Sequence, residues 1–118
     1  MPAKPLISFI VYNHDAEPAI LSQCLDSITQ LSLASADREI IVVDNGDSTE
    51  ALNILLGKDD EITYIHQRYM GVSAAYSMGL RMSTARYVQF VGSHDLLIRA
   101  PYEHCLDIAR YHNPDVVF

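Results

Sequence analysis

Positive charge is scarce in this sequence. Lysine and arginine together account for 8 of the 118 residues, against 15 aspartates and glutamates, so the formal net charge is −7 and the pI is near 4.9. Such a chain repels polyanions, which disfavours non-specific binding to nucleic acid or to an anionic membrane surface. We therefore expect no nucleic-acid partner, and a phosphate-bearing ligand would need a local cation or a metal ion.

Long hydrophobic runs and cysteine clusters are also absent. The apolar stretch "LISFIV" follows a single lysine and becomes polar too soon for a signal peptide or a membrane span. Cys24 and Cys105 lie in helix-like apolar segments without metal-ligand spacing, so we interpret them as free core thiols in a reducing compartment. These features predict a cytoplasmic protein, either free or at the cytoplasmic face of the membrane.

Apolar residues are abundant enough for a single domain, residues 1–118, with a buried core, because 49% of the chain is hydrophobic. Runs of strand length alternate with segments of helical period. The expected strands are residues 6–12, 40–44, 62–66, 87–91 and 115–118. The expected helices are residues 17–32, 49–57, 72–84 and 101–112. This order predicts the α/β class, with a three-layer α/β/α arrangement around a twisted, mostly parallel, Rossmann-like sheet.

Two local features add to this outline. Gly79 lies inside the helix expected at 72–84, which predicts close packing of that helix on the sheet. The last expected strand, in "PDVVF", has no polar stop after it. We therefore expect the chain to be the N-terminal part of a longer protein.

Polar residues follow four of the expected strands. They are Tyr12, Asn13, His14 and Asp15 after the first strand, Asp44, Asn45, Gly46 and Asp47 after the second, Gln67 and Arg68 after the third, and Ser93, His94 and Asp95 after the fourth. We call the residues that follow each strand its exit. The carboxyl ends of parallel strands lie at one edge of a sheet, where α/β proteins bind ligands, so we expect the four exits to form one site. A structural interpretation stays open for each exit; Asp44-Asn45-Gly46, for example, is a favoured turn sequence.

The adjacent Ser93, His94 and Asp95 are not a catalytic triad, because neighbouring side chains in a short turn cannot face one another as nucleophile, base and orienting acid must. A divalent metal site is the better functional interpretation, since a histidine and a carboxylate at a strand end can ligate such an ion. An imidazole ligand shifts the preference from Mg²⁺ toward Mn²⁺ or Zn²⁺. The alternative, which the sequence leaves open, is a solvated turn that Asp95 caps.

Four segments follow one another along the chain: "LISFIVYN", "CLDSITQ", "EIIVVDNGDSTE" and "GVSAAYSMGLRMSTARYVQFVGSHD". Together they span nearly the whole chain and resemble the nucleotide-sugar-binding half of family 2 glycosyltransferases, which have the GT-A fold. The resemblance implies an enzyme that transfers a sugar from a nucleotide-diphosphate sugar to an acceptor hydroxyl. The acceptor would be a saccharide or a lipid-linked molecule.

The resemblance also implies roles for individual residues. The nucleotide-binding set would be Tyr12, Asn13, Asp44, Asn45 and Ser93. Within it, Tyr12 would lie against the nucleobase. Asp44 and Asn45 would hydrogen-bond the base and its ribose.

The expected metal site departs from the family pattern. The usual Asp-x-Asp motif reads Gly92-Ser93-His94 here, so the first carboxylate is missing and the second is an imidazole. A related group of transferases uses Asp-x-His with manganese, which keeps His94, with Asp95 beside it, as the expected ligands of Mn²⁺ or Mg²⁺. That ion would bridge the diphosphate and stabilise the leaving nucleotide. Tyr76 also stands where the family usually has arginine.

The catalytic base is expected elsewhere. In this family the base and the acceptor site lie in the half that follows these strands, and a base must reach the attacking hydroxyl within hydrogen-bond distance. No candidate carboxylate is left over for that role in this sequence. We therefore expect no catalytic residue in the chain, and we expect the 118 residues alone to be inactive.

Two other functions compete with this interpretation. A signalling receiver domain with Asp44 as phosphoacceptor would need a second acidic pair and a late lysine, but the only lysines, Lys4 and Lys58, are misplaced. A non-catalytic binding or assembly module with a degenerate metal motif stays open. Its bare terminal strand would pair with a second copy to give a homodimer.

Overall fold

The computed structural model describes residues 4–46, 50–56, 62–68 and 71–115. Its elements are β1 (Ile7–Asn13), α1 (Pro18–Thr29), the short 3-10 helix η1 (Ser35–Asp37), β2 (Arg38–Asp44), α2 (Glu50–Leu56), β3 (Ile62–His66), α3 (Val72–Met82), β4 (Tyr87–Gly92) and α4 (Arg99–His112). The four strands pair in parallel in the order β3-β2-β1-β4, which confirms the expected α/β class. No helix in the described ranges has the length and apolar character needed to cross a membrane.

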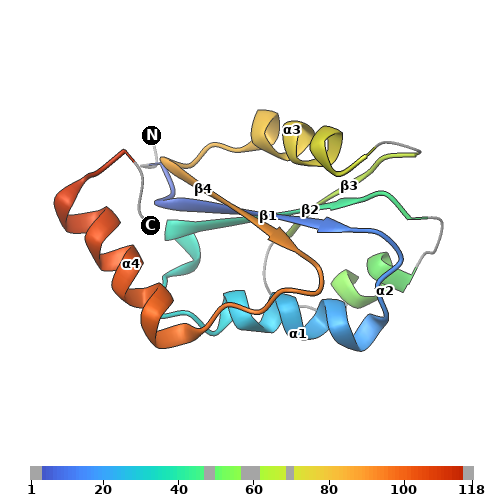
Figure 1. Cartoon of the computed structure of the whole chain (residues 1–118), viewed down its shortest axis with the longest axis horizontal. Coiled ribbons are helices and arrows are strands. Elements are labelled where there is room, and N and C mark those ends of the chain that lie inside the picture. Colours follow the sequence, from blue (N-terminus) through green and yellow to red (C-terminus); the bar gives the residue numbers. More distant parts are fainter. Residues whose placement is uncertain (1–3, 47–49, 57–61, 69–70, 116–118) are drawn as a thin grey trace.

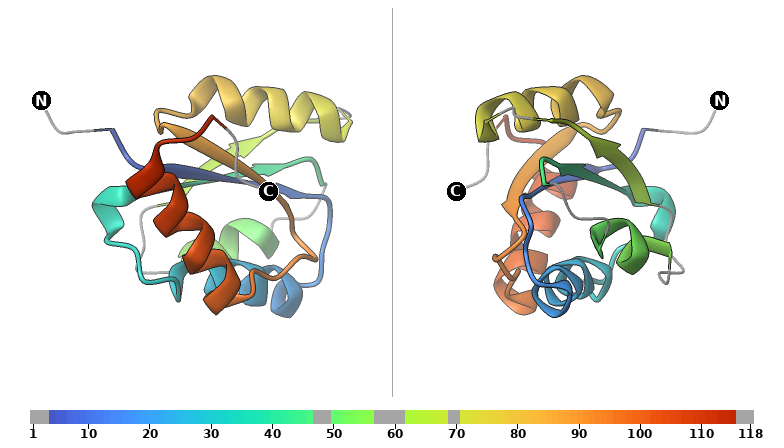
Figure 2. Two further views of the ribbon diagram at one scale, coloured as in Figure 1. Left: turned by 60° about the vertical axis from the view of Figure 1, so that its left-hand side comes forward. Right: turned by 90° about the vertical axis from the view of Figure 1, so that its right-hand side faces the viewer.

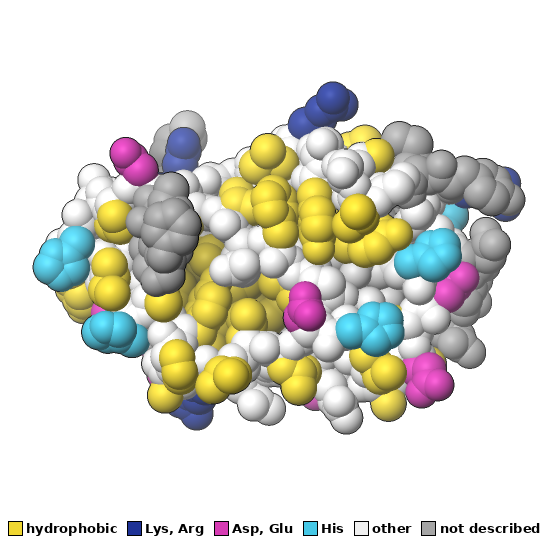
Figure 3. All heavy atoms as spheres, viewed as in Figure 1, with side chains coloured by type: hydrophobic (Ala, Val, Ile, Leu, Met, Phe, Trp, Pro, Cys, Tyr) yellow, Lys and Arg dark blue, Asp and Glu magenta, His cyan; other side chains and the backbone are white. Residues whose placement is uncertain are grey.

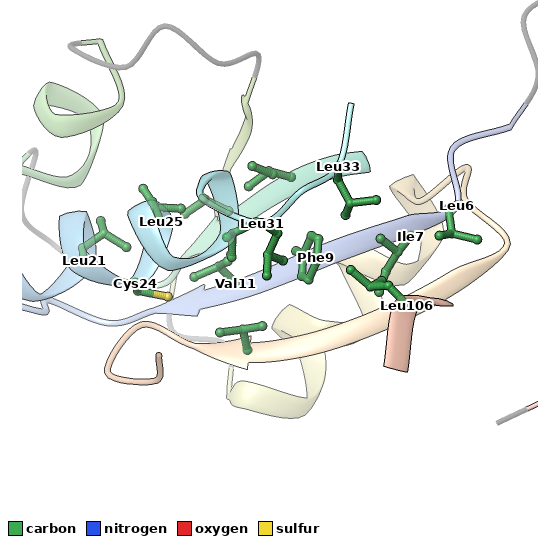
Figure 4. Packing of buried hydrophobic residues seen from close by; sticks show 14 of the residues in the cluster. Leu6, Ile7, Phe9, Val11, Leu21, Cys24, Leu25, Leu31, Leu33 and Leu106 are labelled. Carbon is green, nitrogen blue, oxygen red and sulfur yellow. The ribbon is translucent and has the colours of Figure 1, made fainter. Parts of the chain in front are cut away.

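Helices cover both faces of the sheet, as Figures 1 and 2 show. α3 lies on one face, whereas α1, α2 and α4 lie on the other. Successive strand residues point to opposite faces, so each strand contributes to both layers. Phe9 and Val11 of β1 belong to the larger core on the α1 side, shown in Figure 4, while Ile10 packs with Ala75 of α3. The expected three-layer arrangement is therefore confirmed.

The first helix buries the stripe that its sequence predicts. Its buried residues are Leu21, Cys24, Leu25 and Ile28. The helix ends at Thr29, three residues earlier than expected, because Leu31 and Leu33 both enter the core. Residues two apart lie on roughly opposite sides of a helix but on the same side of an extended segment, so the chain leaves the helix before them.

Several expected strand bounds differ from the structure: β1 begins one residue later than expected, β2 begins two residues earlier, and β4 ends one residue later. β1 extends one residue further, to Asn13, because Asn13 still pairs with Asp44 of the neighbouring strand. Of the strand expected at 115–118, Asp115 lies outside any strand, and residues 116–118 lie outside the described ranges. The edge strands of the described sheet are therefore β3 and β4.

Gly79 of α3 lies against β1 with no room for a side chain. A Cβ atom at this position would be 2.3 Å from Cγ2 of Ile10 and 3.3 Å from its Cδ1. Ile10 is fully buried, and its Cγ2 is attached directly to a β-branched carbon with restricted rotation. The close packing expected from Gly79 is confirmed.

Gly79→Ala should destabilise the fold by about 1–2 kcal/mol, because the cost of overpacking against Ile10, up to about 3 kcal/mol, outweighs the gain of about 1 kcal/mol that alanine has over glycine in a helix. Urea unfolding measures the change in the free energy of unfolding. Gly71→Ala is the matched control, since a Cβ atom there would meet nothing within 4 Å. Ile10→Ala should cost less in the Gly79→Ala background than in the wild type. A Gly79→Ala variant as stable as the wild type would contradict the packing.

Candidate functional site

The parallel register brings the carboxyl ends of the strands to one edge of the sheet, on the right of Figure 1. In this register Asn13 pairs with Asp44, Tyr12 with Gly92, and Asp44 with His66. We call this region, formed by Asn13, Asp44, His66 and Gly92 and the residues that follow them, the strand-exit edge. Its formation confirms the convergence of the four exits that the sequence predicts.

Asp44 is a buried carboxylate at the centre of the strand-exit edge, with 1% of its surface exposed. Its Oδ1 accepts hydrogen bonds from Asn13 Nδ2 at 3.2 Å and from the backbone N–H of Gly46 at 3.0 Å. Its Oδ2 accepts a hydrogen bond from the Tyr64 hydroxyl at 2.6 Å. Three donors therefore hold a group that would be costly to bury without partners.

Tyr64 of β3 is one of the three hydrogen-bond donors to Asp44, and it is absent from the site residues that the sequence predicts. Its register partner is Val42, two residues before Asp44, so alternation along the strands places Tyr64 and Asp44 on the same face. Burial, and then the hydrogen bond to Asp44, raise the pKa of the Tyr64 hydroxyl far above its usual value, which keeps the hydroxyl a donor. The sequence feature that could have indicated this contact is the position of Tyr64, two residues before the polar end of a short strand.

Buried acceptors without partners also occur at this edge. Asn13 is 2% exposed, and its Oδ1 has no hydrogen-bond partner within the described ranges. Gln67 Oε1, just after β3, is in the same situation there. An unpaired buried acceptor costs about 1–3 kcal/mol, so such groups usually meet water or a ligand. The partners of these two buried acceptors, such as an ordered water, would therefore have to come from outside the described ranges.

Tyr12 and Asn45 lie together on the α3 side of the sheet. The Tyr12 hydroxyl accepts a hydrogen bond from Asn45 Nδ2 at 3.5 Å. The Tyr12 ring meets Tyr76 of α3 edge-on at 6.1 Å between centroids, and Tyr76 contacts Phe90 of β4 at 4.7 Å. We call Tyr12, Tyr76 and Phe90 the aromatic row. In Figure 3, apolar side chains gather over α3 and the neighbouring sheet. The row is a surface on which a planar base could stack.

The structure thus divides the predicted nucleotide-binding residues between the two faces of the sheet. Tyr12 and Asn45 lie on the α3 side, whereas Asn13 and Asp44 lie buried on the α1 side. Ser93 is also buried, and its backbone N–H donates to the Tyr12 carbonyl oxygen at 2.9 Å. A ligand on the α3 side would therefore contact the first pair, and the second pair would act from beneath it.

The exit of β4 is a turn that Asp95 closes. Asp95 Oδ2 accepts a hydrogen bond from the Gly92 N–H at 2.8 Å, and the Asp95 N–H donates to the Gly92 carbonyl oxygen at 2.9 Å. The side chains of His94 and Asp95 are both exposed. The capped turn that the sequence leaves open as an alternative is therefore present.

A divalent ion at this turn would find few protein ligands. Within the described ranges, no three His, Cys, Asp or Glu side chains are grouped closely enough to hold a metal ion. His94 and Asp95 offer one imidazole and one carboxylate, and one oxygen of Asp95 already accepts the Gly92 N–H. The pair fits a metal ion only when oxygens of a bound ligand complete the coordination shell.

A cavity of about 420 Å³ lies away from the strand-exit edge. Its lining includes Tyr87 and Gln89 of β4 and Tyr102 of α4, and Figure 3 shows the apolar hollow in this region. Tyr87 is the first residue of β4, so the cavity lies near the amino ends of the strands. None of the predicted site residues lines it.

A family model described as Glycosyl transferase family 2 matches residues 8–118. The chain belongs to this family. Among its curated relatives, a PGL/p-HBAD biosynthesis glycosyltransferase of Mycobacterium bovis is 32% identical over 102 residues, which are 83% of this chain and 39% of the relative. The resemblance to family 2 glycosyltransferases that the sequence predicts is confirmed.

Solved structures agree on the fold. TarS of Staphylococcus aureus superposes with a TM-score of 0.78 at 15% identity, covering 92% of this chain and 20% of TarS. The mannosyltransferase PcManGT of Pyrobaculum calidifontis, solved in complex with GDP-Man and Mn²⁺, gives a TM-score of 0.76 at 18% identity, covering 91% of this chain and 33% of PcManGT. The chain therefore has the GT-A fold, and it spans well under two thirds of each of these proteins.

Cys24 of α1 lies next to the β4 exit. Its thiol donates to the Gly92 carbonyl oxygen at 3.6 Å, and the residue is fully buried. Burial, and then the negative charge of Asp95, raise the pKa of Cys24 to about 11. Both cysteines are free, as the sequence predicts, but only Cys24 is a core residue; the prediction of a core position is wrong for Cys105, which is partly exposed.

At about pH 8, N-ethylmaleimide should modify Cys105 and leave Cys24 unmodified in the folded protein, because reactivity needs both a thiolate and access. Mass spectrometry should count one adduct in buffer and two in urea. The Cys105→Ser variant is the control and should carry no adduct until it is unfolded. Rapid labelling of folded Cys105→Ser would show that Cys24 is accessible and would contradict the structure.

Proposed function

We propose that this chain binds a nucleotide-diphosphate sugar and forms the donor half of an enzyme that transfers the sugar to an acceptor hydroxyl. The observation that carries the proposal is the strand-exit edge, where the pairing of β1 with β2 and with β4 brings Tyr12, Asn45 and the His94 turn to one end of the sheet. Family membership over residues 8–118 supports sugar transfer. The GDP-Man bound to PcManGT supports a nucleotide sugar as the donor.

The nucleoside part would bind on the α3 side of the strand-exit edge. The half-buried Tyr12 ring would stack on the base, because a flat aromatic surface accepts a planar base without sequence-specific contacts. The Asn45 amide lies beside the Tyr12 hydroxyl and can both donate and accept hydrogen bonds, which suits the edge of a base or a ribose hydroxyl. Asn13, Asp44 and Ser93 would support this surface from beneath.

The diphosphate is the part of the donor that an acidic chain is least suited to hold. The net charge of −7 opposes it, and a divalent cation would offset that repulsion. His94 and Asp95 are the residues that would hold Mn²⁺ or Mg²⁺, together with phosphate oxygens. A bound ion of this kind stabilises the negative charge on the leaving nucleotide. The Mn²⁺ in the PcManGT complex supports the use of a divalent metal ion.

The proposal assigns the acceptor site and the catalytic base to residues outside this chain. Asp44 already accepts three hydrogen bonds, and Asp95 closes the β4 turn, so neither is free to take a proton from an attacking hydroxyl. The chain alone should bind a donor without transferring its sugar. The acceptor would be a saccharide or a lipid-linked molecule, and the reaction would take place in the cytoplasm or at the cytoplasmic face of the membrane.

A second candidate function is a non-catalytic binding or assembly module that keeps the fold of the family. The incomplete ligand set at His94 and Asp95 favours it, because two exposed ligands hold a divalent ion weakly. The two functions differ in one measurable property. A donor site binds nucleotide in a metal-dependent manner, whereas the module binds none.

Titration calorimetry with UDP and with GDP, each with and without Mn²⁺, tests the donor site. One of the two nucleotides should bind when Mn²⁺ is present, and His94→Ala should abolish this metal-dependent binding because the imidazole ligand is lost. His104→Ala is the matched control, since His104 is an exposed histidine on α4. It should leave nucleotide binding unchanged.

Equal affinity of His94→Ala and the wild type would remove His94 from the site. Absence of binding by the wild type, with either nucleotide and with or without Mn²⁺, would reject the donor function and favour the non-catalytic module.

A further inference from the structure

We propose that Tyr64, a residue outside the predicted nucleotide-binding set, is a positioning residue for the nucleotide site. Its hydroxyl holds the Asp44 carboxylate, and Asp44 in turn fixes the backbone that presents Asn45 to Tyr12. Tyr64 itself touches no ligand in this arrangement. The inference rests on the proposed nucleotide-binding function and adds to it a residue that acts from the opposite face of the sheet.

The first step is the hydrogen bond between Tyr64 and Asp44. The Tyr64 hydroxyl is the donor to Oδ2 at 2.6 Å, while the other two donors, Asn13 Nδ2 and the Gly46 N–H, both bind Oδ1. Asp44 is 1% exposed, so water does not readily replace a lost donor. Removal of the Tyr64 hydroxyl would leave one buried oxygen unpaired, and the carboxylate would shift or rotate to regain a partner.

Asp44 in turn holds the backbone at the exit of β2 through Gly46. Gly46 donates its N–H to Asp44 Oδ1 at 3.0 Å, and its carbonyl oxygen accepts a hydrogen bond from His66 Nε2 at 2.9 Å. The Asn45 N–H donates to the Asn13 carbonyl oxygen at 2.8 Å. The backbone of the exit is therefore held on both sides of the Asn45 side chain, and a movement of Asp44 would be transmitted to it.

Gly46 packs closely against Asp15 at the exit of β1. A Cβ atom at Gly46 would lie 2.1 Å from Asp15 Oδ1 and 2.8 Å from the Asp15 backbone nitrogen. Asp15 has a φ of 51°, in the left-handed region. The two exits are thus packed together without a gap on this side, and the Asn45 Nδ2 contact with Tyr12, at 3.5 Å, is already at the limit of a hydrogen bond. A small shift of the β2 exit would break it.

Tyr64→Phe removes only the hydroxyl and tests the proposal in the whole chain. The Mn²⁺-dependent affinity for UDP or GDP should fall about tenfold, because the Asn45 side chain would no longer be held in place before binding and would have to be ordered by the ligand. In the ligand-free protein, the backbone amide resonance of Gly46 and the side-chain amide resonances of Asn45 should move in a ¹H–¹⁵N NMR spectrum.

Tyr102→Phe is the matched control. It also removes a partly buried tyrosine hydroxyl, whose hydrogen bond goes to Gln89 Oε1 at 3.0 Å, and Gln89 and Tyr102 line the cavity at the other end of the sheet. Tyr102→Phe should leave the nucleotide affinity and the resonances of Gly46 and Asn45 unchanged. A purely structural hydroxyl would instead lower the melting temperature in both variants without a change in affinity.

His66→Ala supplies a second variant that leaves the buried carboxylate intact. It removes the donor to the Gly46 carbonyl oxygen from an exposed position and should weaken nucleotide binding in the same direction. Unchanged affinity in Tyr64→Phe would overturn the positioning role of Tyr64, whatever the effect of His66→Ala. If the wild type binds neither nucleotide, the proposed function fails, and unmoved Gly46 and Asn45 resonances in ligand-free Tyr64→Phe would then overturn the positioning role separately.

Discussion

A carboxylate at the end of a buried strand needs hydrogen-bond donors, and the strand-exit edge of this protein is organised by how Asp44 obtains them. Its donors come from three places: the side chain of Asn13 on β1, the side chain of Tyr64 on β3, and the backbone of Gly46. This arrangement requires the observed parallel register, because a slip of one residue would turn a strand's side chains to the other face of the sheet. The sheet positions the donors, and the carboxylate in turn makes any other register costly.

The division of the site between two faces follows from the same alternation. Asp44 and Asn13 point toward α1, where they are shielded from water, while Tyr12 points toward α3 and stays half-buried. The polar cluster can therefore be rigid without occupying the surface that a ligand would use. A surface that is ordered before binding loses less conformational freedom when the ligand arrives, so a fixed support beneath it favours affinity.

The sequence predicts those parts of the fold that depend on local pattern. The apolar runs of β1 and β2 and the buried stripe of α1 follow from periodicity, and Gly79 indicates close packing because a missing side chain is visible in the sequence. The Tyr64 contact with Asp44 and the aromatic row depend on the strand order β3-β2-β1-β4, which joins segments that are distant in the chain. The end of α1 also escapes local reasoning, since it is set by the burial of Leu31 and Leu33 against the sheet.

In the proposed donor site, Gly92 and His94 at the β4 exit, in place of two carboxylates, would have two opposite electrostatic consequences. Carboxylates hold a divalent ion strongly, so their absence would weaken the binding of the ion on its own. Their absence would also remove negative charge from the place where a diphosphate would lie, in a chain that already carries a net charge of −7. The repulsion between protein and diphosphate is therefore smaller than it would be with two carboxylates. With few protein ligands, the ion would depend on the phosphate oxygens for its coordination, so ion and nucleotide would bind together rather than in sequence.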